Sequence, residues 1–173
     1  MRRRLFVLGV VIQATVLIGW AASLEWARAG AVTIRLETAP VDPRELLRGD
    51  YVLLNYKISE IPLSAFAGER PGSDHIGFPV YVALAPRGAF HEAVAASLDP
   101  ARLTLQPGQL RLVGTLAWQV QGRGARVTYG IERYYVPEGK GVLPRGTIEA
   151  EVAVTADGRP FLTRLFVDGR PYP

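Results

Sequence analysis

Two stretches of this chain gather carboxylates, arginines and tyrosines, the residue types that transfer protons or hold polar ligands. The first reads VDPRELLRGDYVLLNY over residues 41–56, and the second reads YGIERYYVPEG over residues 129–139. The candidate motif or binding residues are Asp42, Arg44, Arg48, Gly49, Asp50, Tyr51, Leu54 and Tyr56 in the first stretch, and Glu132, Arg133, Tyr134 and Glu138 in the second. A ligand site would form if Asp50 and Glu132 converge with Arg48 between them.

Each of these residues also has a structural interpretation. Asp50 follows Gly49 at a turn into a strand, where a carboxylate commonly accepts backbone N–H groups. Tyr56 belongs to the expected strand over residues 51–58 and is expected to pack in the core or across strands, as is Tyr51. A buried Glu132 needs a partner, and Arg44 or Arg48 would supply one. We favour the structural interpretation in each case, and we assign no catalytic residue.

The residues needed for disulfides, metal sites and serine or cysteine protease chemistry are missing or unsuitably placed. The chain has no Cys, which excludes disulfides, thiolate metal sites and Cys nucleophiles. Its two histidines are His75, in an expected exposed loop, and His91, whose neighbour Glu92 faces the opposite side of a strand; we therefore expect no metal and no cofactor. A signal-peptidase-like protease needs a Ser-Met nucleophile and a Lys base, but the single Met is Met1.

The elements that must position these residues are mostly β-strands. All 13 prolines and 16 of the 18 glycines lie after residue 29, which breaks long helices. Expected strands cover residues 31–37, 51–58, 78–84, 109–120, 125–136, 148–155 and 160–167, whereas 89–97 fits a strand or a short helix. Asp157-Gly158 and Asp168-Gly169 predict tight turns. This pattern predicts an antiparallel β-sandwich or barrel-like domain over residues 30–173.

The first 29 residues form a separate unit. Twenty residues from Leu5 to Leu24 carry no charge, long enough for a helix to cross the hydrocarbon layer. Three arginines precede this run, so the positive-inside rule places the N-terminus in the cytoplasm and the domain outside. A cleaved signal peptide ending at Ala27-Arg28-Ala29 is the alternative. We expect an uncleaved anchor, because signal-peptide apolar regions are shorter, about 7–15 residues.

Net charge gives little support for nucleic-acid binding. The whole chain carries +4, but residues 1–29 contain four arginines and one acid. Residues 30–173 therefore carry only +1, so we expect no nucleic-acid partner.

One motif resembles that of a known family. Residues 49–56, GDYVLLNY, match the pattern G-D-Y-x-x-L-x-Y at every fixed position, and residues 129–139 are similar to the second block of the same family. The chain thus resembles the bacterial GDYXXLXY family over roughly residues 30–170. The resemblance implies a membrane-anchored protein of uncharacterised function, often encoded beside multi-spanning membrane proteins, with no catalytic residues to carry over.

These observations lead to a main hypothesis and its alternatives. The main hypothesis is a single-pass protein of the cytoplasmic membrane whose periplasmic β-domain binds or assembles with an integral membrane protein. The alternatives are a small-ligand-binding or hydrolytic enzyme that uses Asp50 and Glu132, or a degenerate signal-peptidase-like domain. A concave pocket lined by both motif blocks would favour a ligand.

Overall fold

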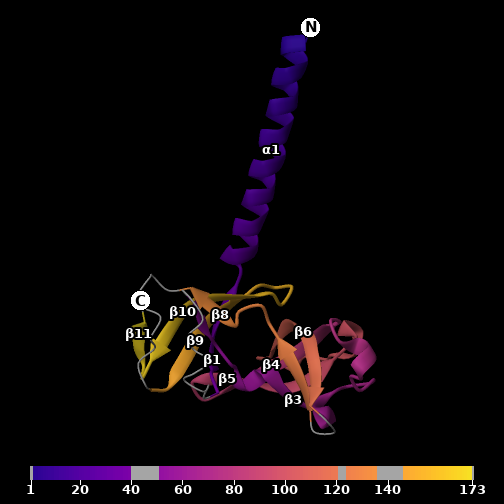
Figure 1. Ribbon diagram of the computed structural model, residues 1–173, viewed down its shortest axis with the longest axis vertical. Coiled ribbons are helices and arrows are strands. Elements are labelled where there is room, and N and C mark those ends of the chain that lie inside the picture. Colours follow the sequence, from indigo (N-terminus) through magenta and orange to yellow (C-terminus); the bar gives the residue numbers. More distant parts are fainter. Residues whose placement is uncertain (1, 40–50, 121–123, 136–145, 173) are drawn as a thin grey trace.

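A computed structural model describes residues 2–39, 51–120, 124–135 and 146–172 of the protein. One long helix stands clear of a β-rich body (Figure 1). This helix, α1, spans Arg2–Ala29, and its window Phe6–Ser23 is long and apolar enough to cross a membrane, with no part buried against the rest of the protein. Such a helix satisfies its own backbone hydrogen bonds, which a segment in lipid must do.

The β-body begins two residues after α1 with a four-stranded antiparallel sheet. Its strands are β1 (Val32–Glu37), β9 (Ile148–Val154), β10 (Pro160–Val167) and β11 (Arg170–Tyr172), in the order β1-β9-β10-β11. Ile34 pairs with Val152 and Leu36 with Ala150, and all four side chains are buried, whereas Val32 at the start of β1 is 58% exposed.

Both expected turns of this sheet are present. Gly158 has a φ of +89°, and the turn between β10 and β11 has positive φ at Asp168 (+48°) and Gly169 (+74°). Two consecutive positive φ values are typical of the hairpin turn whose twist matches that of the flanking strands.

A five-stranded antiparallel sheet forms the other half of the body. Its order is β3-β7-β6-β4-β5, built from β3 (Glu60–Pro62), β7 (Gly124–Thr128), β6 (Leu110–Val120), β4 (Pro79–Arg87) and β5 (Phe90–Ser97). Short 3-10 turns connect the strands: η1 (Lys57–Ser59), η2 (Leu63–Ala65), η3 (Ser73–His75) and η4 (Pro100–Arg102). Pro79 occupies the first position of its strand, as expected for a residue without an N–H.

A short third sheet pairs β2 (Tyr51–Leu53) with β8 (Arg133–Tyr135). Side chains from all three sheets join one hydrophobic core, and the arrangement approaches a closed barrel. The prediction of a mostly β protein with one N-terminal apolar helix is confirmed.

Several expected strands are shorter than predicted. The strand expected over residues 51–58 ends at Leu53 and is followed by η1, and the strand expected over 125–136 is divided into β7 and β8. Residues 89–97, ambiguous in sequence, include strand β5.

Gly114 lies in β6, whose register shift against β7 falls further along the strand, between Leu116 and Trp118. A Cβ on Gly114 would lie 2.8 Å from the Thr128 carbonyl oxygen and in overlap with Val127, so this glycine permits close packing of β6 against β7.

Candidate functional site

The two motif blocks, distant in sequence, meet in the small β2–β8 sheet. Tyr51 pairs with Tyr135, Val52 with Tyr134 and Leu53 with Arg133. The contact continues past the strands, where the Leu54 N–H donates to the Glu132 carbonyl oxygen at 2.7 Å. The backbone of one block therefore serves as the hydrogen-bonding partner of the other.

Two buried tyrosines connect the second block to the first block and to the turn that follows it, in opposite directions. Tyr56, 1% exposed, donates its hydroxyl to the Ile131 carbonyl oxygen at 2.8 Å, while Tyr129, 6% exposed, donates to the Ile58 carbonyl oxygen at 2.7 Å. Leu54, which directly follows β2, is buried as well. These bonds satisfy backbone acceptors that are closed to water, which is a structural role.

Glu132 lies beside both phenols. Its Oε1 accepts the Tyr129 backbone N–H within a tight turn. Burial raises the pKa of Tyr56 and of Tyr129 well above the usual value, and the negative charge of Glu132 raises both further. The two hydroxyls therefore stay protonated and remain hydrogen-bond donors across the physiological range.

The second block does not present the single face expected from a continuous strand. Tyr129 and Ile131 are buried, whereas Arg133 is exposed and Tyr135 is 71% exposed. The reason is Gly130, whose φ of +78° breaks the strand and turns the chain between β7 and β8. Positive φ is a conformation that glycine adopts at little cost.

Tyr134, the middle residue of β8, is also a candidate from the sequence. It is half-buried and pairs with Val52 of β2. Its ring packs at a tilt against that of Tyr172, with centroids 6.5 Å apart. This ring contact joins β8 to β11.

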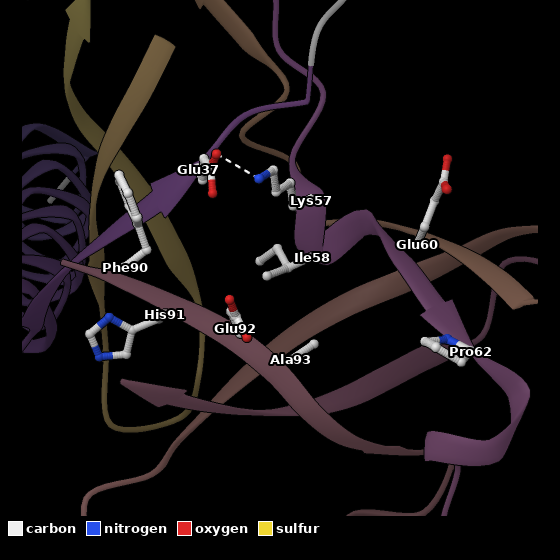
Figure 2. Close-up of a pocket in the computed structure, with 9 residues that line it drawn as sticks. All are labelled: Glu37, Lys57, Ile58, Glu60, Pro62, Phe90, His91, Glu92 and Ala93. Carbon is white, nitrogen blue, oxygen red and sulfur yellow. Dashed lines mark ion pairs between the residues drawn. The ribbon is translucent and has the colours of Figure 1, made fainter. Parts of the chain in front are cut away.

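A pocket opens just beyond the first motif block, where β1 and η1 approach the edge strands β3 and β5 (Figure 2). Its volume is about 200 Å³. The lining residues are Glu37, Lys57, Ile58, Glu60, Pro62, Phe90, His91, Glu92 and Ala93. Figure 2 shows Lys57 and Glu37 reaching toward each other across one side of the pocket, with Nζ 2.6 Å from Oε1.

Cations meet the other two glutamates of the pocket as well. Glu60 accepts a hydrogen bond from Arg126 at 3.0 Å, and Glu92 lies 3.8 Å from Arg87. Burial lowers the pKa of His91, so its imidazole is neutral at pH 7. The pocket therefore offers paired charges and a neutral imidazole to a small polar group. Its lining includes no Ser, Thr or Cys that would serve as a nucleophile.

Arg126 connects this pocket to the motif. Its guanidinium donates to Asn55 as well as to Glu60, and it lies over the exposed ring of Trp118, 5.5 Å from the ring centroid. Sequence reasoning missed this cluster, because Asn55 occupies a variable position of the motif and Arg126 is 71 residues away. The one sequence signal near Arg126 is the strand pattern of the residues around it, which does not indicate its partners.

The histidine expected in an exposed loop is instead half-buried. The Nδ1 atom of His75 accepts the Gly72 N–H at 3.1 Å, and its ring meets the ring of Phe78 edge-on. Within the described residues, no group of three His, Asp or Glu side chains is arranged to hold a metal ion.

Half of the candidate residues fall outside the part of the chain that the structure describes. They are Asp42, Arg44, Arg48, Gly49, Asp50 and Glu138. The convergence of Asp50 with Glu132, and the pairing of Glu132 with Arg44 or Arg48, therefore stay hypotheses. Among the described motif residues, Leu54 and Tyr56 of the first block hydrogen-bond to the second block, at Glu132 and Ile131.

Comparison with known proteins agrees with the motif. A profile of the family described as GDYXXLXY protein matches residues 13–165, which is most of the chain, so the chain belongs to this family. The matched range extends from the apolar helix to β10. No curated protein matches. No solved structure matches either.

Proposed function

We propose that this member of the GDYXXLXY family is a single-pass protein of the cytoplasmic membrane whose periplasmic β-domain binds or assembles with an integral membrane protein. The proposal includes an uncleaved anchor of residues 1–29 and a domain of residues 30–173. The single observation that carries it is the apolar helix, which stands away from the β-body with none of Phe6–Ser23 buried (Figure 1). A charge-free helix of this length left in water would expose a large apolar surface, which a bilayer removes.

The flanks of the helix support one orientation. Three arginines precede the apolar window, and cytoplasmic ends of membrane helices are enriched in such residues. Trp20 and Trp26 are both exposed near the other end, where indole rings favour the membrane interface. This arrangement directs the β-domain away from the cytoplasm.

The short connection between helix and domain favours a membrane partner. α1 continues for six residues beyond Ser23, about 9 Å, and only Gly30 and Ala31 separate it from β1. The domain is thus held close to the bilayer surface, which raises its effective concentration toward any protein embedded there.

The pocket supports a second candidate, a small-ligand-binding function. Its volume of about 200 Å³, and the few charged side chains in an otherwise mostly apolar lining, suit a small molecule with a polar group. However, neither motif block lines the pocket among the described residues. Lys57 and Ile58 come directly after the first block, and no described residue of the second block is part of the lining. A pocket lined by both blocks would favour a ligand, so we rank this candidate below the membrane partner.

Photocrosslinking in native membranes tests the proposed function. A photoreactive residue replaces Trp118 or Phe78, which are exposed on the β-body, or Trp26 next to the bilayer. We expect a discrete adduct with a multi-spanning membrane protein, identified by mass spectrometry. For the probes at Trp118 and Phe78, a matched chain in which an unrelated single-pass anchor replaces residues 1–29 should retain the adduct if the β-domain recognises the partner. Adducts with soluble proteins alone, or none, would contradict the proposal.

A further inference from the structure

The apolar helix contains one polar side chain whose hydrogen bonds are not satisfied. Three polar residues lie in the window Phe6–Ser23, namely Gln13, Thr15 and Ser23. The Thr15 hydroxyl donates to the Val11 carbonyl oxygen at 2.8 Å, and the Ser23 hydroxyl donates to that of Trp20 at 2.7 Å. The side chain of Gln13 is exposed and makes no hydrogen bond to any described residue.

The depth of Gln13 makes this amide costly in a membrane. The middle of the window falls between Ala14 and Thr15, so Gln13 lies within about 2 Å of the midplane along the helix axis. The headgroups are about 15 Å away, beyond the reach of this side chain. Hydrocarbon offers no hydrogen bond, and a buried amide without a partner is unfavourable. The amide therefore requires a polar partner within the bilayer.

The helix face around Gln13 allows a neighbour to approach. Gly9 lies one turn before it, and no atom lies within 4 Å of the position that a Cβ would occupy there. Leu17 lies one turn after Gln13, about 40° around the helix, whereas Ile18 lies about 140° away, on the opposite side. Small residues at such positions let two helix backbones come close enough for side-chain hydrogen bonds.

We propose that two copies of this chain associate in parallel through α1, with the two Gln13 amides hydrogen-bonded to each other. This inference rests on the proposed membrane anchor. An amide carries both donors and an acceptor, so it is complementary to itself. Two copies inserted with the same orientation place their Gln13 side chains at the same depth. A different protein would need a polar side chain of its own at that depth. The pair gives the β-domains a fixed two-fold arrangement above the membrane.

Cysteine crosslinking of the full chain in its native membrane tests this inference, because the chain has no Cys of its own. Leu17→Cys and Ile18→Cys are matched variants at nearly the same depth, the first about 40° and the second about 140° around the helix from Gln13. We expect oxidation to give a covalent dimer with Leu17→Cys and little with Ile18→Cys. Gln13→Leu in the Leu17→Cys background should lower the dimer population by about 3- to 30-fold, and Gln13→Asn should largely restore it.

Alkaline extraction of the same membranes separates this inference from the proposed function. If the variants stay in the membrane but Leu17→Cys and Ile18→Cys crosslink equally, or Gln13→Leu has no effect, the Gln13 pair is wrong and the anchor stands. If Leu17→Cys crosslinks only to a different membrane protein, that protein supplies the partner and the pairing of two copies is overturned. Release of the chain by alkali would overturn both.

Discussion

The hydroxyl of Tyr56 gives the sharpest test of what the family motif does. Tyr56→Phe keeps the buried ring and removes only the group that donates to the Ile131 carbonyl oxygen at 2.8 Å. Because this acceptor is then left without that donor away from water, we expect the free energy of unfolding to fall by about 1–3 kcal/mol. For a protein of this size, each kcal/mol lowers the melting temperature by about 3 °C.

The assay is denaturation of the full chain in detergent micelles, followed by near-ultraviolet circular dichroism, which reports side-chain packing of the β-domain. Tyr81→Phe is the matched control, since Tyr81 is a half-buried strand tyrosine whose hydroxyl has no hydrogen bond among the described residues. It should change stability by less than about 0.5 kcal/mol. If Tyr56→Phe costs no more than Tyr81→Phe, the motif tyrosine is not a structural connector, and the reasoning fails.

Three further predictions concern stability. Burial raises the pKa of Tyr56 and Tyr129 in the folded state, so the unfolded chain loses these two protons at a lower pH than the folded chain does. The free energy of unfolding should therefore fall above about pH 10, by up to about 1.4 kcal/mol per pH unit for each phenol. A free energy of unfolding that stays constant above pH 10 would contradict this. Gly114→Ala would bring a methyl group into overlap with Val127 and should cost about 1–3 kcal/mol, whereas Gly30→Ala, with open space around it, should cost far less; equal thermal melts would refute the packing role. Glu37→Gln removes the ion pair with the half-exposed Lys57 and should change stability by less than about 1 kcal/mol, so a large loss in the same denaturation assay would show that the pocket is part of the core.

Local patterns predicted the fold well where they were regular. The alternation over residues 148–155 gave the buried face of β9, and the Asp-Gly pairs gave both turns, because each signal depends only on neighbouring residues. The strand breaks were harder to predict. Gly130 breaks a run of strand-forming residues with a positive φ, and the chain turns there between β7 and β8.

The candidate site was predicted less completely. The motif supplied Leu54 and Tyr56, but their partners depend on long-range pairing of β2 with β8, which sequence spacing does not encode. The pocket also escaped prediction. Its glutamates lie on three different strands, and only the approach of β1 to β5 brings Glu37 near Glu92.

The central claim is that an uncleaved helix tethers the β-domain to a membrane. The most direct measurement is the intact mass of the chain recovered from native membranes after an alkaline wash. We predict recovery in the membrane pellet at 18.9 kDa, the mass of the 173 residues with residues 1–29 retained. Recovery in the wash, or a mass that lacks residues 1–29, would contradict the account.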